Sequence, residues 1–411
     1  MSRYLCIQTG ARRAYAVPRL LAEAGRLDRF HTDLAGNVGW GRILSRVPGP
    51  GGLASRLRGR RVPDRVLPHT TTHDGAALRH LVKDIFGRRD PETRFRRQID
   101  FARDFGHSLL RHGFGDATHL YSMLNEGGGL FEEAKARGIR VVSEVYILLS
   151  TERILTEEQG RFPDWEPSPL DYASLREELL PDDPYPGNID LCLCPSEAVR
   201  EDLIAHWGVL PERTALVPYG MDPRWLELET RPEPGRILFV GTADLRKGIH
   251  YLAFASELLR SRGFRGEFRI AGNVSETVRH HPDCRHLTFL GRIPRDRIHE
   301  EFQRADLFVL PSLAEGSAEV TYEALAAGVP QIVTRAAGSV ARDGIDGLLV
   351  PERDPQALAD AIERSVGDRT WREAASVASR ERARECTWER YGERLLTALQ
   401  QLAHNPQSAF K

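Results

Sequence analysis

The sequence from Ala305 to Pro330, ADLFVLPSLAEGSAEVTYEALAAGVP, decides how the rest of the chain is interpreted. Asp306 to Leu310 is a short apolar run before a proline, which predicts a buried strand of a parallel sheet. A polar turn, Ser312 to Gly316, precedes a helical pattern that ends at Gly328, and Ser317 is the expected N-cap of that helix. A strand, a turn and a helix N-terminus in this order present backbone N–H groups and a helix dipole, which together attract phosphate.

Two glutamates mark this stretch as a candidate binding site. Glu315 lies in the turn and Glu323 in the helix, with seven residues between them. The helix around Glu323 is largely apolar, and a buried carboxylate without a partner is unfavourable, so a ligand hydroxyl is a natural partner. Each glutamate alone has a plain structural explanation, because a Glu at a helix start often interacts with the dipole and others face water. The pair is therefore more informative than either residue.

The spacing Glu-x7-Glu after a buried strand resembles the signature of the retaining GT-B glycosyltransferases of family four. The resemblance implies an α/β fold of two Rossmann-like domains facing a central cleft. It implies that Glu315 contacts the donor sugar and Glu323 the ribose of the donor nucleotide. The turn residues Gly316, Ser317 and Ala318 would line the donor, although members of that family often have glycine at the position of Ala318.

Composition indicates an ordinary soluble globular protein. The chain has 411 residues, which predicts roughly two to three domains. With 41% hydrophobic and 28% charged residues and a net charge of -1, it shows no bulk attraction to nucleic acid. Five scattered cysteines argue against a disulfide framework. The first residues lack the long apolar region of a signal peptide and no run of 18 apolar residues occurs, so we expect a cytoplasmic location.

The first half of the chain alternates strand and helix patterns, which predicts a doubly wound parallel sheet. Tyr4 to Gln8 predicts the first buried strand, and Gly10 allows close approach of the following loop to a ligand. A full Gly-x-Gly-x-x-Gly fingerprint is absent because Arg13 stands where a third glycine would be sought, so a dehydrogenase-type site is poorly supported. The family resemblance implies that the loop, including Gly10, Ala11 and Arg12, faces the cleft and positions the acceptor.

Further acceptor-side residues follow the next strands. Ligands of doubly wound sheets bind beyond the carboxyl ends of the strands, so we expect Asn125, Glu126, Glu144 and Tyr146 to border the cleft. Members of the family often carry a histidine near the end of a strand like Ile139 to Val145. This chain has Tyr146 at that place, so no catalytic histidine is carried over.

Two segments of the first half are rich in arginine. The first, Gly41 to Arg65, has no acidic residue before Asp64, and the second, Arg79 to Arg97, ends in an arginine cluster. The simpler interpretation is a solvated loop and helix face. The alternative is that the arginines from Arg42 to Arg61 contact an anionic membrane surface or an anionic acceptor, since each basic residue near such a membrane contributes about 1 kcal/mol. Nucleic acid is disfavoured because aromatic residues do not interleave with these arginines.

The domain boundary is expected in the middle of the chain. Thr151 to Asn188 is acidic and proline-rich and predicts a short helical excursion rather than a domain. The sequence PSEAVREDL … VPYGMD resembles the passage out of the first domain of the family, which puts the linker near Asp222 to Gly235. We therefore expect an acceptor-binding domain over residues 1–225, a donor-binding domain over 226–387, and a helix over 388–402 that crosses back to the first domain.

The second domain opens with a strand and the loop GTADLRKG. The order Lys247-Gly248 is the reverse of a Walker P-loop, so that motif is absent. The loop resembles the glycine-led loop of the family, whose lysine contacts the donor diphosphate, although Thr242 stands where an arginine is usual and Arg246 is the candidate for its charge. The resemblance implies these donor-binding residues: Gly241, Thr242, Arg246, Lys247, Arg292, Ile293, Glu315, Gly316, Ser317, Ala318 and Glu323.

The expected activity is transfer of a sugar from a nucleotide-sugar, with UDP-sugars favoured, to an unidentified glycan, glycolipid or small metabolite. Lys247 would stabilise the leaving diphosphate as its charge develops, and Glu315 would orient the sugar hydroxyls. No Asp-x-Asp or clustered histidine occurs in the donor region, so we expect neither a metal nor another cofactor. A non-catalytic sugar-nucleotide binder and a GT-B nucleotide-sugar epimerase remain the alternatives.

Overall fold

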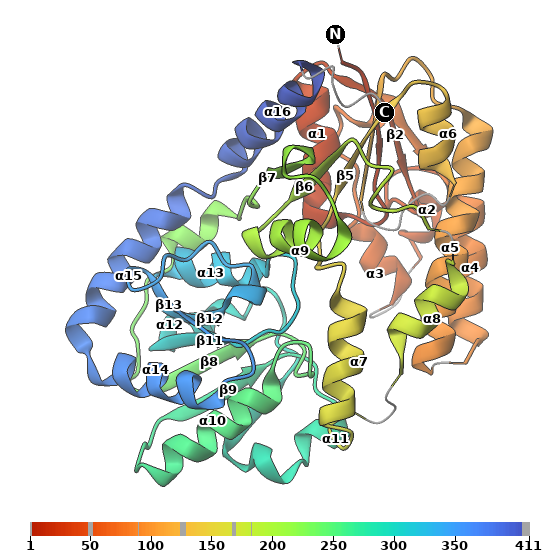
Figure 1. The fold of residues 1–411 in the computed structure, drawn as a ribbon. Coiled ribbons are helices and arrows are strands. Elements are labelled where there is room, and N and C mark those ends of the chain that lie inside the picture. Colours follow the sequence, from red (N-terminus) through yellow and green to blue (C-terminus); the bar gives the residue numbers. More distant parts are fainter. Residues whose placement is uncertain are drawn as a thin grey trace.

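The computed structural model describes residues 2–47, 52–88, 90–123, 129–166, 170–181 and 183–404, with the side chains of 403 and 404 excluded. Within these residues the chain forms two parallel sheets, one in each half (Figure 1). The predicted two-domain α/β architecture is therefore confirmed.

The first sheet has seven strands in the described residues, all paired in parallel. Their spatial order is β3 (Thr70–Thr72), β2 (Leu27–Thr32), β1 (Tyr4–Ile7), β4 (His119–Met123), β5 (Arg140–Glu144), β6 (Leu191–Cys194) and β7 (Thr214–Leu216). Tyr4 and Cys6 pack in one apolar cluster and Leu5 and Ile7 in another, so β1 is buried on both faces. Such burial explains the apolar runs of the sequence.

Helices supply both of these apolar clusters. On one face α1 packs with the returning C-terminal helix, and on the other lie α5, α6 and α9. The helices of this half are α1 (Ala16–Glu23), α2 (Gly39–Leu44), α3 (Leu53–Arg58), α4 (Asp74–Phe86), α5 (Pro91–His112), α6 (Leu130–Ala136), α7 (Thr151–Arg161), α8 (Tyr172–Leu179) and α9 (Glu197–Trp207).

The second sheet has six strands in the described residues, also all parallel. Their order is β10 (Leu287–Gly291), β9 (Glu267–Ala271), β8 (Arg236–Val240), β11 (Leu307–Leu310), β12 (Gln331–Thr334) and β13 (Gly347–Val350). The helices here are α10 (Ile249–Ser261), α11 (Glu276–Arg279), α12 (His299–Arg304), α13 (Glu319–Ala327), α14 (Pro355–Gly367), α15 (Arg369–Arg384) and α16 (Trp388–His404).

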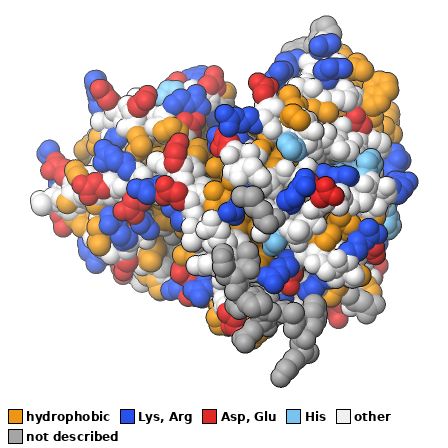
Figure 2. Space-filling view, turned by 90° about the horizontal axis from the view of Figure 1, so that it is seen from above, with side chains coloured by type: hydrophobic (Ala, Val, Ile, Leu, Met, Phe, Trp, Pro, Cys, Tyr) orange, Lys and Arg blue, Asp and Glu red, His pale blue; other side chains and the backbone are white. Residues whose placement is uncertain are grey.

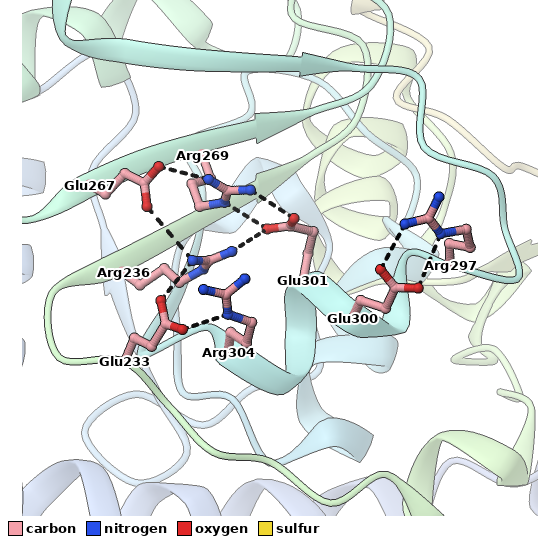
Figure 3. Close-up of polar contacts among 8 residues, drawn as sticks. All are labelled: Glu233, Arg236, Glu267, Arg269, Arg297, Glu300, Glu301 and Arg304. Carbon is pink, nitrogen blue, oxygen red and sulfur yellow. Dashed lines mark hydrogen bonds and ion pairs between the residues drawn. The ribbon is translucent and has the colours of Figure 1, made fainter.

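An ion-pair network lies at the amino end of this second sheet (Figure 3). Arg236, at the start of β8, is buried and pairs with Glu233 at 2.7 Å and with Glu301 of α12 at 3.0 Å. Glu301 also accepts from Arg269 of β9 at 2.7 Å. Burial raises the pKa of Glu301, but Arg269 and Arg236 more than offset this and hold it below its ordinary value. The network attaches α12 to the amino ends of the strands, opposite the carboxyl ends where ligands of such sheets bind.

The chain crosses between the domains twice, near Met221 and near Thr387, and these two segments lie next to each other. Met221 pairs with Thr387 in a parallel bridge, and the Met221 amide donates to the Cys386 carbonyl at 2.9 Å. After this point α16 lies against the first domain (Figure 1), where Leu395 and Leu399 join the apolar cluster of α1. The C-terminal helix therefore completes the core of the first domain.

The excursion between β5 and β6 forms helices, as predicted, and part of it contacts the second domain. Glu158 of α7 is fully buried and accepts from the Tyr251 hydroxyl at 2.5 Å and from Arg353 at 2.8 Å. Beyond α7, Trp165 stacks on His281 with 4.0 Å between ring centroids and belongs to the apolar core of the second domain. A segment of the first half is thus clamped to the second.

The carboxyl ends of the two sheets face each other. Ser196, after β6, donates its hydroxyl to the carbonyl of Gly316, after β11, at 2.5 Å. A Cβ atom placed on Gly316 would lie 1.8 Å from the carbonyl oxygen of Tyr146, so only glycine allows this approach. Glu201 of α9 pairs with Arg335, after β12. Ligand sites of doubly wound sheets therefore converge between the domains.

The visible outer face carries Lys and Arg side chains among Asp and Glu side chains (Figure 2), in keeping with the small net charge. Of the second arginine segment, Arg96 pairs with Glu178 at 3.0 Å and Arg97 is buried against Asp84 at 2.8 Å, so these two have structural partners. In the described part of the chain, no helix is long and apolar enough to cross a membrane.

Candidate functional site

The loop after β8 folds its lysine back across its first glycine. Gly241 has φ 153°, and a Cβ atom there would lie 2.7 Å from Cδ of Lys247. A larger residue at this position would displace the lysine side chain. The sequence GTADLRKG therefore encodes a loop whose cation lies over its own backbone at the carboxyl end of β8.

The two cations of this loop converge on one carboxylate. Lys247 Nζ lies 2.5 Å from Glu315 Oε1, and Arg246 Nη1 lies 2.6 Å from the same oxygen. Arg246 also donates to the carbonyl of Ala314 at 2.9 Å. Burial raises the pKa of Glu315, but Lys247 and Arg246 more than offset it, so Glu315 stays ionised. Arg246 thus points toward Glu315 rather than away from the candidate site.

Asp244 is a residue of this loop that sequence reasoning missed. Its Oδ1 accepts from the backbone N–H of Lys247 at 2.9 Å, which fixes the turn before α10. Burial raises the pKa of Asp244, and the charge of Arg246 opposes this rise. The acid within GTADLRKG was the available signal, because a turn aspartate commonly accepts from a following backbone N–H.

The turn from Glu315 to Ala318 is held by the loop after β12. The N–H groups of Glu315 and Ala318 donate to Ala336 and Ala337, each at 3.0 Å. In the described part of the chain, the N–H groups of Gly316 and Ser317 have no hydrogen-bond acceptor. These two donors lie beside Glu315, where an anionic group could accept from them.

Ser317 is not the N-cap that the sequence predicted. The helix α13 begins at Glu319, its N-cap is Ala318, and no side chain caps it. The Ser317 hydroxyl instead donates to the carbonyl of Gly338 at 2.6 Å and lies 2.9 Å from the Tyr322 hydroxyl. This tertiary hydrogen bond takes the hydroxyl away from the helix start.

Glu323 lies on α13 with only part of its surface exposed. Burial raises its pKa from 4.5 to about 7, and Arg295 opposes this rise. Among the described residues no hydrogen-bond donor pairs with this carboxylate, whereas Glu315 has two. Glu323 is therefore a poorly solvated carboxyl group with capacity to accept hydrogen bonds from a ligand.

The remaining donor-side residues have less constrained surroundings. Thr242 and Arg292 are exposed, and Ile293 packs on the core of the second domain. Thr242 follows β8 and Arg292 follows β10, with β9 between these strands, and Gly272 after β9 donates its N–H to the carbonyl of Gly291 at 2.9 Å. Arg292 and Ile293 thus follow β10, at the edge of the second sheet.

On the first domain, Gly10 is held by a partly buried ion pair that sequence reasoning missed. Its N–H donates to Asp33 Oδ1 at 2.8 Å, and Asp33 Oδ2 pairs with Arg60 at 3.1 Å. Burial raises the pKa of Asp33, opposed by Arg60. The guanidinium of Arg12, after Ala11, lies 4.0 Å from the ring centroid of Tyr146. Two arginines therefore flank the loop expected to face the acceptor.

Glu144 lies inside the first domain rather than at its surface. Glu144 is 3% exposed, and its carboxylate pairs with Arg13 and accepts from the Tyr121 hydroxyl, so it does not border the cleft as the sequence predicted. Arg13 lies over the Tyr219 ring at 4.0 Å. We interpret this network as the support of the loop after β1. Asn125 and Glu126 fall outside the described residues.

Two further residues that sequence reasoning missed join the domains at the site. Ser196 bonds to Gly316, and Glu166 accepts from the Leu245 N–H at 3.1 Å, so each contacts a donor-side loop from the first half. Their partners are distant in sequence, and no local pattern identifies them. Within the described ranges, no three His, Cys, Asp or Glu side chains are grouped as they would be to hold a metal ion.

Comparison with known proteins agrees with this arrangement. Residues 234–368, which carry the whole second sheet, match the family model described as Glycosyl transferases group 1. D-inositol 3-phosphate glycosyltransferase of Thermobifida fusca (strain YX) is 24% identical over 379 residues, covering 82% of each chain. Sulfoquinovosyl transferase SQD2 of Arabidopsis thaliana is 27% identical over 220 residues, covering 48% of this chain and 42% of that protein.

Solved structures share the fold. Anabaena HepE in complex with UDP and glucose matches with a TM-score of 0.57 and 15% identity, covering 97% of this chain and 100% of that one. Sucrose-phosphate synthase from Thermosynechococcus elongatus matches with a TM-score of 0.62 and 18% identity, covering 98% of this chain and 99% of that one. The solved structures show the shared fold, while the group 1 match and the glycosyltransferase names of the sequence relatives support a transferase enzyme.

Proposed function

We propose that the protein transfers a sugar from a nucleotide-sugar, with UDP-sugars favoured, to an acceptor bound by the first domain. The observation that carries the proposal is the convergence of Lys247 and Arg246 on Glu315, beside the unmatched N–H groups of Gly316 and Ser317. A fixed cluster of cations and N–H donors suits a diphosphate. The structural relative HepE was solved with UDP and glucose.

In the proposed reaction, the bond between the anomeric carbon and the diphosphate breaks as the acceptor hydroxyl oxygen attacks, and the hydroxyl proton passes to the leaving phosphate oxygen. Lys247, Arg246 and the N–H groups of the turn would stabilise the negative charge that develops on the leaving diphosphate, without a metal ion. Glu315 would orient the sugar hydroxyls, and Glu323 would accept from the ribose hydroxyls. Retention of configuration, with attack on the face that the diphosphate leaves, is proposed from the Glu-x7-Glu resemblance, and a cytoplasmic location stays a prediction.

The test is a screen of nucleoside diphosphates and nucleotide-sugars by thermal unfolding, followed by turnover with candidate acceptors. Bound ligand raises the apparent stability by mass action, about 2.7 kcal/mol at a concentration 100 times Kd. We expect UDP and a UDP-sugar to raise the melting temperature, and a Glu323→Ala variant to need more ligand. Absence of any shift with all UDP and GDP compounds would contradict the proposal.

Turnover separates the proposal from its rivals. Nucleoside diphosphate release that depends on an acceptor identifies a transferase. Conversion of the donor sugar without an acceptor identifies an epimerase, and ligand binding without turnover identifies a non-catalytic binder. A glycan, a glycolipid and a small polyol phosphate should be tested as separate acceptors, because no described residue selects among them.

A further inference from the structure

The helix α2 presents its large apolar side chains to solvent. Trp40 and Ile43 of α2, and Val47 three residues after its end, are 57%, 53% and 51% exposed. The small residues Gly41 and Ser45 face the domain instead, and a Cβ atom on Gly41 would lie 2.2 Å from the carbonyl oxygen of Ala35. An ordinary surface helix has the opposite arrangement, with its apolar residues against the core.

The same two stretches of chain carry exposed arginines without compensating acids. Arg42 and Arg46 lie on the same stretch, and Arg56, Arg58 and Arg61 follow on or just after α3; all five are exposed. No aspartate or glutamate occurs between residues 39 and 61. Exposed apolar side chains together with arginines suit the surface of a lipid bilayer with acidic headgroups. Such a bilayer has anionic headgroups at its surface and apolar acyl chains beneath them.

Buried contacts and hydrogen bonds attach the described parts of this segment to the domain. Leu57 of α3 is buried in a small apolar cluster with Leu34 and Ala77, and the Ser45 hydroxyl donates to the carbonyl of Gly36 at 3.0 Å. The sixth arginine, Arg60, pairs with Asp33 beside Gly10, so the segment ends near the acceptor-side loop. The exposed side chains therefore have a fixed orientation relative to the rest of the first domain.

We infer that the outer face of residues 39–47 and 53–61 is a docking surface for anionic lipid bilayers. Trp40, Ile43 and Val47 enter the boundary between headgroups and acyl chains, and the arginines pair with lipid phosphates. Isolated exposed apolar residues need no explanation, but Trp40 and Ile43 on α2 and Val47 just after it share these two short stretches with five exposed arginines and form a matched surface. This inference does not depend on the identity of the acceptor.

The experiment is sedimentation of the full chain with vesicles of phosphatidylcholine, with and without phosphatidylglycerol, at low and high salt. We expect pelleting with phosphatidylglycerol that weakens as salt screens the arginines. The double variant Arg42→Ala/Arg46→Ala should bind about 30-fold more weakly, because each basic residue contributes about fivefold. Trp40→Ser/Ile43→Ser should lose at least about tenfold, because the buried apolar area is removed.

Matched controls lie on the second domain. Val377→Ser removes an apolar side chain that is 61% exposed, and Arg364→Ala/Arg384→Ala removes two exposed arginines. Both should bind vesicles as the unaltered protein does. Unchanged melting temperatures would establish that all variants are folded.

Three results would overturn the inference. The first is no pelleting with phosphatidylglycerol vesicles at low salt. The second is full binding by Trp40→Ser/Ile43→Ser with loss in the arginine variant, which indicates general attraction to polyanions. The third is self-association in light scattering that Trp40→Ser/Ile43→Ser abolishes, without vesicle binding, which assigns the surface to a second copy of the chain.

Discussion

Lys247 Nζ lies 2.5 Å from Glu315 Oε1, so the proposed diphosphate cation and the proposed sugar-binding carboxylate are ion-paired with each other. Arg246 shares the same carboxylate oxygen. A carboxylate between two cations holds both in place and lowers the reorganisation needed when a diphosphate binds. The ion pairs thus link the proposed diphosphate-binding residues to the proposed sugar-binding residue.

Replacing Lys247 with alanine should lower kcat by about 10²–10³, the usual cost of one electrostatic contact to developing charge. Arg246→Ala should cost a comparable factor, because Arg246 faces Glu315 rather than solvent. Steady-state kinetics with a saturating donor measure both. Lys83→Ala, on the exposed face of α4, is the control and should retain full activity. Full activity of Lys247→Ala would remove the residue from the mechanism.

Donor affinity should depend on the protonation of Glu323, whose pKa burial raises to about 7. The ionised form accepts hydrogen bonds more strongly, so affinity should fall as pH decreases below about 7, by up to about tenfold per pH unit. Calorimetric titration of UDP across this range measures it. Glu323→Gln should bind more weakly and lose this pH dependence, and an unchanged profile in that variant would contradict the assignment.

Transfer should continue in a saturating chelator, because Lys247 and Arg246 are proposed to hold the leaving diphosphate. The measurement is turnover after exhaustive treatment with EDTA, then after addition of Mg²⁺ or Mn²⁺. If EDTA abolishes transfer and either ion restores it, a metal stabilises the leaving group and the proposed mechanism is wrong.

The buried hydrogen bonds that Glu158 of α7 accepts from the second domain should stabilise the protein at neutral pH. Burial raises the pKa of Glu158, but hydrogen bonds from His250, Tyr251 and Arg353 lower it to about 2. This stability is present above the ordinary pKa of 4.5 and is lost as pH falls toward about 2. Glu158→Gln should cost on the order of 2 kcal/mol in the free energy of unfolding at pH 7.

Thermal unfolding at several pH values checks this prediction. The neighbouring Glu157 is exposed and pairs with Arg353 at 3.5 Å, so Glu157→Gln is a matched control with little expected effect. Equal melting temperatures for both variants at neutral pH would show that the buried contacts of Glu158 contribute no stability.

Apolar runs located several strands well: β1, β5 and β11 lie within the predicted runs Tyr4 to Gln8, Ile139 to Val145 and Asp306 to Leu310. The strand β2, LDRFHT, was not predicted, since Asp28 and Arg29 interrupt its pattern. Its buried His31 is accommodated by His73, with 2.8 Å between ring nitrogens, a partner 42 residues away. Polar groups in such a strand depend on tertiary contacts that one sequence does not reveal.

The candidate site likewise contains residues that the sequence predicted and pairs that it did not predict. The family resemblance assigned Lys247 and Glu315 to the donor site, and the structure brings these two residues into contact. Asp33 and Arg60, Glu144 and Arg13 were not predicted as pairs, because they join residues from separate loops and strands. Burial of Glu144 in particular follows from two partners, Arg13 and Tyr121, that lie far from it in the chain.

The position of Trp165 determines where the protein can be divided into separately expressed fragments. It precedes the expected boundary at residue 226 by 61 positions, yet it is 3% exposed within the core of the second domain. A fragment starting at 226 would lack this indole and uncover the apolar side chains that surround it, including Phe254. Recombinant second halves, or split pairs that reassemble, therefore need a polypeptide spanning α7 to Glu166 to be supplied along with them.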